Sequence, residues 1–483
     1  MVLDGKYEKK NGDSFKDLGE KEMKEKSQII QYKFNIHAFP AEIYSKAVCL
    51  VEKIKEKGFS AFFVGGCIRD VLMGFVPHEI DITTSASPQD IREMFDKVSL
   101  VGEKFGVCIV NIEGVDFHVA TFRKDSSYED GRHPSYVTFS NPKEDALRRD
   151  FTINALFWEP TDSMLYDYAG GLDDLHDGVI RAVGDPLERF KEDRLRIIRC
   201  ARFVSQLSFS IEKSTYQAMF SIKDSLKGVS IERFRDEFEK ILMSKKPSYA
   251  IELLYDLGIL EQIIPELCAL KDVPQPKVYH PEGDVWVHTI IALDIAARKI
   301  PDRDISLMWA VLLHDVGKPS TISMPKDEQD RIRFNGHDVS GENLTWTILT
   351  RLKLPKDLIA EVAYIVKDHM RIGKAREMRP GRLKLMMSHP TFTRELALNF
   401  IDSISSHKDI SNWEFLKNEY EEFQKGKALP AQIVDGVFLI DMGFNPSPIF
   451  SEIIEKSYEA QLEGVFNDSE GAKTFVSSSF KLS

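Results

Sequence analysis

The 483-residue sequence has no apolar run approaching the roughly 20 residues of a membrane-spanning helix. Its first thirty residues have no apolar core or cleavage site of a secretory signal, and they are rich in Lys and Glu. The five cysteines form no CxxC pair and are odd in number, which favours a reducing compartment over a disulfide framework. We therefore expect a soluble, cytoplasmic protein without membrane contact, whose cysteines are small core residues.

The sequence also has no excess of positive charge. A net charge of -12 argues against polyanion binding by the whole surface, so a nucleic-acid site must be a local basic patch. Two such patches exist, although each could also be a solvated helix face. The first contains Lys191, Arg194, Arg196, Arg199 and Arg202. The second contains Lys367, Arg371, Lys374, Arg376, Arg379, Arg382 and Lys384.

The length predicts two to four domains, because domains average roughly 150 residues. Strand signals dominate before residue 150 and helical periodicity dominates after it, which predicts an α+β fold with a small α/β head and a long helical body. Boundaries are expected near Gly170-Gly171, in the proline-rich stretch 273–281 and near 426–430. In the head we expect helices at 40–57, 67–73 and 87–95, strands at 60–64 and 79–84, and a hairpin of 107–112 with 115–122.

The expected strand at 79–84 alternates apolar and polar residues, which is the period of a strand with one buried face. Glu79 and Asp81 should therefore lie on the same face, close enough to share Mg²⁺. Such a pair can neutralise a nucleoside triphosphate and help to activate a hydroxyl for phosphoryl transfer. A solvated strand face is the alternative. The preceding Gly65-Gly66 turn, with Arg69 one helical turn later, favours the phosphate site.

An ordered set of motifs is more specific than either feature alone. It runs through Gly65-Gly66-Cys67-Ile68-Arg69-Asp70, Glu79-Ile80-Asp81, Val119-Ala120-Thr121-Phe122-Arg123, Asp130-Gly131-Arg132-His133-Pro134 and Arg148-Arg149-Asp150-Phe151-Thr152-Ile153-Asn154-Ala155. With this set the chain closely resembles the class II CCA-adding enzymes and bacterial poly(A) polymerases, which belong to the polymerase-β-like nucleotidyltransferases. The resemblance is dense over residues 40–270 and continues thinly to about 465.

The resemblance implies roles for six residues of the head. Gly66 and Arg69 would contact the nucleotide, Glu79 and Asp81 would bind Mg²⁺, and Arg149 with Asp150 would contact nucleotide and ribose. Two positions depart from the family pattern. Glu79 stands where Asp is usual, and His118 stands where Glu is frequent, with Asp116 on the same strand face as a substitute carboxylate.

A second motif follows the head. A helix is expected from Lys191 onward, with Asp193, Arg196, Arg199 and Arg202 on one cationic face. Cytosine and adenine both present an amine donor beside a ring-nitrogen acceptor, so one Asp acceptor and one Arg donor can accept C and A and reject U and G. The family's EDxxR motif, which does this, is matched by Glu192, Asp193 and Arg196. Salt bridges on a solvated helix are the alternative, and we take 231–237 as helix packing with surface ion pairs.

The C-terminal half contains His314-Asp315 after an apolar helix. With His288 and Asp402 this pattern resembles the HD phosphohydrolase superfamily, whose H…HD…D core would map to His288, His314, Asp315 and Asp402. His337 and His369 would be further ligands or phosphate binders. The resemblance implies a second divalent transition metal in this region.

The resemblance, together with these motifs, implies a Mg²⁺-dependent enzyme that transfers CMP and AMP from CTP and ATP to the 3′ end of tRNA. A poly(A) polymerase, a split CC-adding or A-adding enzyme, and an HD phosphohydrolase with a degenerate RNA-binding head remain as alternatives. The loop 123–134, which in the family helps the switch to ATP, argues against a CC-only enzyme. The predicted parts are a charged, disordered tail at 1–33, a nucleotidyltransferase head at 34–170, a helical neck at 171–272, an HD domain at 273–425 and a helical C-terminal tail at 426–483.

Overall fold

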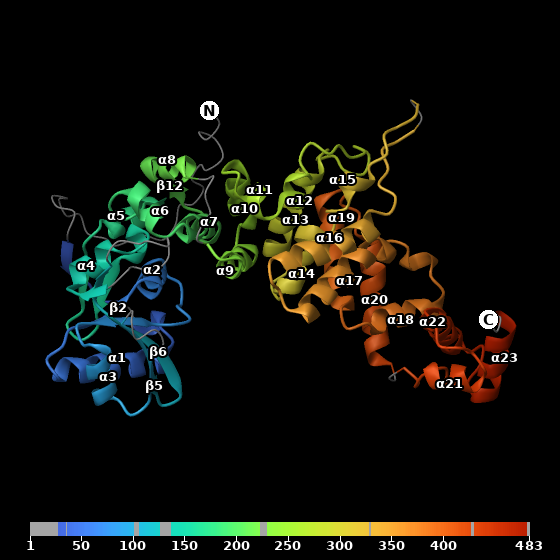
Figure 1. Ribbon diagram of the computed structural model, residues 1–483, viewed down its shortest axis with the longest axis horizontal. Helices are drawn as coiled ribbons and strands as arrows, with labels where there is room; N and C mark the ends of the chain where they lie inside the picture. The colour runs from blue at the N-terminus through green and yellow to red at the C-terminus, as the bar shows by residue number, and fades with distance from the viewer. Residues whose placement is uncertain are drawn as a thin grey trace. The chain divides into compact units, whose positions relative to one another are not determined.

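The computed structural model describes residues 28–34, 36–100, 106–125, 137–222, 229–327, 330–426 and 429–480. The chain divides into two compact units, Met1–Leu260 and Glu261–Ser483. Within the described residues every strand lies in the first unit, and the second unit is built of helices (Figure 1). This distribution confirms the predicted α+β fold class.

The first unit is built on an eight-stranded mixed sheet with the order β1-β10-β9-β2-β3-β6-β5-β4. In it β3 and β6 pair in parallel, and the other neighbours pair antiparallel. The parallel pair places the start of β3 beside β6. The strands are β1 (Gln28–Gln31), β2 (Ala61–Val64), β3 (Asp81–Thr84), β4 (Val98–Leu100), β5 (Val107–Ile112), β6 (Val115–Thr121), β9 (Leu156–Glu159) and β10 (Met164–Asp167).

Local sequence signals account for most helices and turns of the head. The helix α3 begins with a complete capping box, in which Ser87 and Asp90 satisfy each other's backbone amides. Glu113 and Gly114 both have positive φ, as a tight hairpin turn requires, and they join β5 to β6 as predicted. Helices α1 and α3 cover one face of the sheet (Figure 1). The helices are η1 (Ile36–Ala38), α1 (Ala41–Glu56), α2 (Gly66–Leu72), α3 (Pro88–Met94), α4 (Pro142–Leu147) and η3 (Thr152–Asn154).

Two expectations for the head were wrong. Residues 28–31, assigned to a disordered tail, form the edge strand β1, because β10 offers them a hydrogen-bonding partner far along the sequence. Helices dominate beyond residue 150 as expected, although strands β9 and β10 also lie there. Strand β3 begins at Asp81, so Glu79 precedes the strand rather than belonging to it. The rest of the expected tail, residues 1–27, lies outside the described residues.

The neck follows the sheet and is mostly helical. The single helix expected from Lys191 onward is broken at Asp193, whose extended backbone separates α6 from α7. The carboxylate of Asp193 accepts a hydrogen bond from the amide of Leu195, the first residue of α7, at 3.0 Å. The elements are α5 (Gly171–Asp177), α6 (Pro186–Glu192), α7 (Leu195–Leu207), α8 (Lys213–Ser221), α9 (Ile231–Leu242), α10 (Pro247–Asp256) and α11 (Ile259–Ile263), with the short pairs β7 (Arg123–Asp125) with β8 (Val137–Phe139) and β11 (Val179–Ile180) with β12 (Ser210–Ile211).

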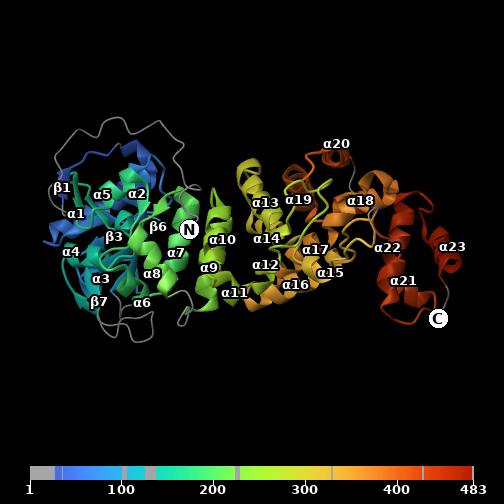
Figure 2. The same ribbon diagram turned by 90° about the horizontal axis from the view of Figure 1, so that it is seen from above.

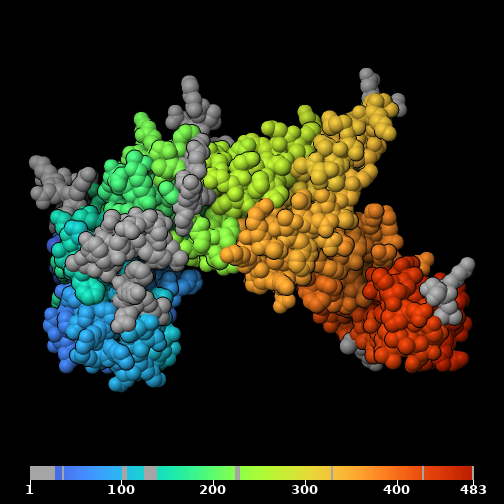
Figure 3. Space-filling view, in the orientation of Figure 1, coloured from blue at the N-terminus to red at the C-terminus, as the bar shows by residue number. Residues whose placement is uncertain are grey.

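In the second unit, α13, α14, α16 and α17 pack in one bundle, and α19 packs on α13, α14 and α17 (Figure 2). The yellow to red surface in Figure 3 belongs to this unit. Its helices are α12 (Pro265–Cys268), α13 (Val285–Lys299), α14 (Ile305–Leu313), α15 (Lys318–Thr321), α16 (His337–Arg351), α17 (Lys356–Ile372), η4 (Ala375–Glu377), α18 (Pro380–Ser388), α19 (Phe392–Ser405), α20 (Ser411–Lys425), α21 (Gly436–Asp441), α22 (Ile449–Leu462) and α23 (Ser469–Ser479).

All five cysteines are unpaired. Cys67, Cys108 and Cys200 are buried as expected, whereas Cys49 is exposed and Cys268 is only partly covered, so not every cysteine is a core residue. Among the described residues, no helix combines the length and the apolar character needed to cross a membrane.

The close contact between Gly171 and Thr152 gives a test of the packing that holds η3 against α5. A Cβ added at Gly171 would lie 2.2 Å from the Thr152 carbonyl oxygen, which is backbone and cannot rotate away. Gly171→Ala should therefore lower the free energy of unfolding by about 1–3 kcal/mol. The helical Gly436 has nothing within 4 Å of its added Cβ, so Gly436→Ala serves as a control expected to change stability by less than about 0.5 kcal/mol. Thermal unfolding of the two variants decides, and equal midpoints would contradict this packing.

Candidate functional site

Glu79 and Asp81, the acidic pair, lie where the sheet meets the Gly65-Gly66 turn, here called the GG turn. Asp81 is the first residue of β3, opposite Val64 at the end of β2, and its side chain is 45% exposed. Burial raises the pKa of Asp81, and the negative charge of the nearby exposed Glu79 raises it further. The two carboxylates are thus close enough to repel one another. This is the situation that a divalent cation relieves, and oxygen ligands of this kind suit Mg²⁺.

The neighbouring strand β6 brings a histidine to this pair. The Nδ1 atom of His118 lies 3.8 Å from the Oδ1 atom of Asp81. Asp116, the expected substitute carboxylate, instead accepts a hydrogen bond from Asn111 at 2.6 Å. Of the two positions on β6 that the sequence singled out, the structure therefore brings His118 to Asp81.

The GG turn places Gly66 at the first turn of α2 and fixes Arg69 behind it. Gly65 has φ +78, a conformation that glycine adopts freely. Arg69 is buried, and its guanidinium donates to Asp70 at 2.7 and 2.9 Å and to the Oδ1 atom of Asn154 at 2.7 Å. Arg69 is therefore held in place from two sides.

A second arginine lies on the other side of the turn. Arg149 donates to the Oδ2 atom of Asp145 at 3.2 Å and to the carbonyl of Asn154 at 3.4 Å. Its guanidinium also lies 5.1 Å from the centre of the Phe157 ring. The positive charge of Arg149 partly offsets the raised pKa of Asp81, so these two groups face the same space.

Asp150 is the centre of a buried network that joins the head to the neck. Its carboxylate accepts from the amide of Phe151 at 2.8 Å, from the side chain of Asn154 at 3.1 Å and from Arg199 of α7 at 2.6 Å. Burial alone would raise the pKa of Asp150, but Arg199 holds it well below its usual range. Asp150 is therefore an anion at every ordinary pH.

The arginines of α7 continue this network. Glu237 of α9 is buried and pairs with Arg202 at 2.6 Å and with Arg199 at 3.7 Å. The ring of Phe203 lies 4.2 Å from the Arg202 guanidinium and 5.1 Å from that of Arg69. Phe203 is buried, as its assignment to the core predicted. Residues 231–237 pack as part of a helix, as expected, but their ion pairs are not all on the surface, because Glu237 is inside.

The expected base-reading groups already have partners within the protein. Asp193 accepts from Arg233 of α9 at 2.6 Å. Arg196 donates to Glu192 at 2.5 Å and to the carbonyls of Arg189 and Arg148 at 2.7 and 3.2 Å. The predicted cationic face of α7 is thus compensated by acids from three elements, rather than by salt bridges along one solvated helix.

Several residues of this site had no role assigned from the sequence. Asn154 bridges Arg69 and Asp150, Asp145 holds Arg148 and Arg149, and Arg233 holds Asp193. Their shared signal is a polar residue at a buried or half-buried position, which only the fold reveals. Most of the expected 123–134 loop lies outside the described residues, since 126–136 are not among them.

A second polar site lies in the C-terminal unit, and its residues come from five segments. The structure brings together every residue named from the HD pattern. His288 lies 3.3 Å from His314 and 3.1 Å from Asp402 between side-chain atoms, and Asp315 lies 3.3 Å from His314. His337 and His369 complete the cluster, and their Nε2 atoms lie 3.2 Å apart. The Nε2 atom of His337 also lies 3.7 Å from the Oδ1 atom of Asp315.

All four imidazoles of this cluster are oriented alike. The Nδ1–H of His314, His337 and His369 donates to a backbone carbonyl of the preceding turn. That of His288 donates to Glu282 at 2.8 Å. Each Nε2 atom is thus left facing the other residues of the cluster, and that of His288 lies 3.1 Å from Asp402. This donor set of imidazole nitrogens and carboxylates fits a divalent transition metal.

The charges of the cluster agree with a cation site. Burial alone would lower the pKa of His288, but hydrogen bonds to Asp402 and Glu282 raise it to about 9. Burial and the neighbouring His314 lower the pKa of His369 to about 4. One proton is therefore held between His288 and Asp402, and a metal that displaced it would release it. The cluster opens into a cavity of about 550 Å³ that Lys318 also lines.

Comparison with known proteins identifies these regions. Residues 61–181 match the poly A polymerase head domain, 208–271 match a probable RNA and SrmB-binding site of polymerase A, and 285–435 match the HD domain. The chain is 32% identical over 449 residues to a CCA-adding enzyme of Lactobacillus johnsonii, covering 90% of this chain and 98% of that relative. It is 34% identical over 349 residues to a CCA-adding enzyme of Staphylococcus haemolyticus, covering 70% of this chain and 86% of that relative.

A solved structure agrees with these matches. The chain resembles the Bacillus stearothermophilus CCA-adding enzyme in complex with CTP with a TM-score of 0.67 and 26% identity, covering 90% of this chain and 97% of that chain. The likeness extends over nearly the full length of both proteins. The chain therefore belongs to the family of CCA-adding enzymes, with an HD domain in its C-terminal unit.

Proposed function

We propose that this chain is a CTP(ATP):tRNA nucleotidyltransferase, which adds CMP and AMP to the 3′ end of tRNA and releases pyrophosphate. The observation that carries the proposal is the Glu79–Asp81 pair facing Arg149, in a chain that matches a CCA-adding enzyme over 90% of its length. The similar Bacillus stearothermophilus protein was solved with CTP, and a Thermotoga maritima relative was solved with tRNA. Both ligands fit the proposed reaction.

Glu79 and Asp81 would hold the Mg²⁺, since they offer adjacent carboxylate oxygens in a half-exposed position. When bound, the metal offsets negative charge on the triphosphate and lowers the pKa of the attacking hydroxyl. Gly66 offers backbone at the start of α2, where its lack of a side chain permits close approach of a phosphate. Arg69 and Arg149 add fixed positive charge, because Asp70, Asn154 and Asp145 hold their guanidinium groups.

The neck would select the base. Asp193 offers an acceptor for the exocyclic amine of C or A, and Arg196 offers a donor for the ring nitrogen. Both groups now have internal partners, so an arriving base must take the place of Arg233 at Asp193 and use the remaining N–H groups of Arg196. Glu192, Asp150, Arg199 and Arg202 would act by holding these groups in position, through the buried contacts that join α6, α7 and the head.

We also propose that the HD cluster binds a divalent transition metal through His288, His314, Asp315 and Asp402. Asp315 belongs to this set and to a second one with His337 and His369, so two ions could share it. Bound metal supplies a Lewis acid and an activated water, which suits hydrolysis of phosphate esters. Lys318, 2.6 Å from Asp315, and Arg331 line the cavity and would attract a phosphate.

The predicted parts of the chain stand as proposals, with the head beginning by residue 28 because β1 belongs to its sheet. The separate apolar core formed by residues of 434–476 supports a C-terminal tail that starts near 426. We propose the cytoplasm as the compartment, consistent with five unpaired cysteines.

The first test of this proposal is nucleotide incorporation into tRNA lacking its 3′ end. Addition limited to C, C and A supports the proposal, long A tails would indicate a poly(A) polymerase, and addition of C alone or A alone would indicate a split enzyme. Asp81→Asn should lower CMP transfer on the order of 10³-fold, because the pair loses a charged metal ligand. Asp116→Asn, a matched change on the adjacent strand, should leave transfer within about threefold of the parent. Undiminished transfer by Asp81→Asn would contradict the metal assignment.

The second test concerns base choice. In Asp193→Asn the carboxamide can donate as well as accept, so uracil no longer leaves a polar group unpaired. The ratio of UMP to CMP incorporation should rise by about tenfold or more. Asp185→Asn, which preserves the cap of α6, should leave the ratio unchanged. An unaltered ratio in the Asp193 variant would remove Asp193 from base selection.

The third test concerns the HD cluster. Glu282 orients His288 without itself facing the other ligands, so Glu282→Gln should weaken Mn²⁺ or Ni²⁺ binding by about 10–100-fold. Isothermal titration calorimetry of the full chain measures this loss. Asp284→Asn, two residues away and still able to cap α13, is the matched control and should bind metal like the parent. Equal affinity in the Glu282 variant would show that the cluster does not hold metal in this way.

A further inference from the structure

A cavity of about 800 Å³ lies within the C-terminal unit, beside the HD cluster and distinct from it. The segment 367–384 supplies most of its lining and carries seven Lys and Arg against two acids, in a chain whose net charge is -12. We name this cavity the basic groove. Its cationic lining residues are Lys367, Arg371, Lys374, Arg379 and Arg382.

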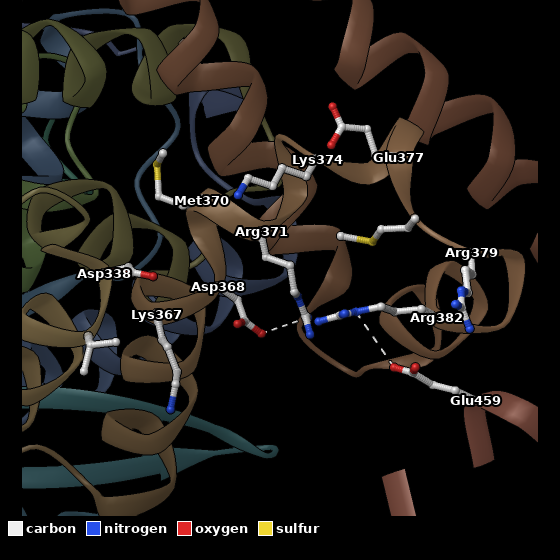
Figure 4. Close-up of a pocket in the computed structure, with 12 residues that line it drawn as sticks. Asp338, Lys367, Asp368, Met370, Arg371, Lys374, Glu377, Arg379, Arg382 and Glu459 are labelled. Atoms are coloured by element: carbon white, nitrogen blue, oxygen red, sulfur yellow. Dashed lines mark ion pairs between the residues drawn. The ribbon is translucent and has the colours of Figure 1, made fainter. Parts of the chain in front are cut away.

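Three of the five cations of the groove have ion pairs, and two have none within 4 Å among the described residues. Arg371 pairs with Asp368 at 2.8 Å, and the longer contact between Arg382 and Glu459 is 3.8 Å (Figure 4). Lys374 and Arg379 are exposed, and no ion pair within 4 Å is found for either among the described residues. Lys367 pairs with Glu342 at 2.9 Å, and the carboxylate of Glu377 is turned away from Arg371 and Arg382 (Figure 4).

Helix polarity makes this arrangement unusual. Arg379 is the N-cap of α18 and Arg382 lies in its first turn, which contains no acid. A helix N-terminus carries partial positive charge, so cations there cost stability and anions are favoured. The C-terminus of α17 carries partial negative charge, so a cation such as Arg371 is favourable there. The N-terminus of α18 carries partial positive charge, so Arg379 and Arg382 are unfavourable there. An anion bound between the two helix ends would reduce the repulsion among these cations.

The two arginines converge on this point. Arg371 from α17 and Arg382 from α18 extend toward one another across the groove, with Lys374 on the same side of the cavity as Arg371 (Figure 4). Guanidinium groups from two elements, together with exposed lysines, are the usual means of binding phosphate oxygens. The volume of the groove is in the range of about 300–1,000 Å³ that encloses drug-sized ligands, so it exceeds what a single phosphate needs.

The groove also adjoins the HD cavity. Met370 lines both spaces, and its neighbours in the sequence are His369 of the cluster and Arg371 of the groove. A polyanion lying in the groove would therefore pass beside the HD residues. Among polyanions, an RNA strand is the one that the proposed tRNA-modifying function brings to this protein.

We propose that the basic groove binds the phosphodiester backbone of RNA next to the HD cavity, through Lys374, Arg379, Arg371 and Arg382. The choice of RNA rests on the proposed function. The contact with the backbone rests on the groove itself.

The experiment compares RNA binding by two double variants of the full chain. Lys374→Gln with Arg379→Gln removes two exposed cations of the groove for which the described part of the chain shows no ion pair within 4 Å. Lys299→Gln with Lys356→Gln removes two exposed cations of the same unit outside the groove and changes the net charge equally. Binding of a fluorescently labelled tRNA transcript lacking its 3′ end is measured by anisotropy over a range of salt concentrations.

Each phosphate contact contributes about 0.7–0.9 to the slope of log affinity against log salt. The groove variant should therefore show a slope shallower by about 1.5 and bind about tenfold more weakly at low salt. The control variant should bind like the parent. The inference is overturned if the groove variant keeps the parental slope, or if the control loses as much. It is also overturned if a polyglutamate peptide competes as well as unlabelled RNA, since the groove would then suit an acidic protein.

CMP incorporation is measured in parallel with the same transcript. Absence of incorporation by the parent would refute the proposed function, while the comparison of slopes still decides whether the groove binds RNA. The two failures are thus distinguishable.

Discussion

The ion pair between Asp150 and Arg199 is the interaction on which the proposed nucleotide site depends. It is the point where the GG turn, the segment after α4 and the neck helix α7 meet, through Asn154 on one side and Glu237 on the other. Burying such charges is costly, and leaving one of them without its partner would cost up to about 3–5 kcal/mol. The network is stable because its acids and cations are placed together, which keeps Arg69 and the N-terminal end of α7, proposed to read the base, in one geometry.

This arrangement has a consequence for how a nucleotide would bind. Asp193 and Arg196 are held by Arg233 and Glu192 before any base arrives. Base recognition is then an exchange of partners, and a base that restores the hydrogen bonds is favoured over one that leaves a polar group unpaired. In the HD cluster the same logic applies to a metal. The hydrogen bond made by each Nδ1 atom turns the Nε2 atom of that ring inward, so the proposed ligand set would be formed before an ion binds.

Sequence reasoning succeeded where the signal is local. The capping box at Ser87 and the turn at Glu113-Gly114 depend only on residues that are neighbours in the sequence. The motif residues of the HD cluster, including Asp402, also lie together in the structure. It failed where the partner is distant. Strand β1 needs β10, more than a hundred residues later, and the break at Asp193 accompanies a contact with Arg233 forty residues on. Asn154, Glu237 and Glu282 gain roles only from what the fold places beside them.

The most direct measurement of the central claim is a double-mutant cycle on the Asp150–Arg199 pair, using Asp150→Asn, Arg199→Gln and the double variant. Both the free energy of unfolding and the discrimination between CTP and UTP are measured for each protein. The account predicts a coupling energy above about 1 kcal/mol in the free energy of unfolding. It also predicts that each single variant loses discrimination between CTP and UTP, and that the double variant loses no more than either single variant. Additive effects in both quantities would show that the pair does not hold the nucleotide site together.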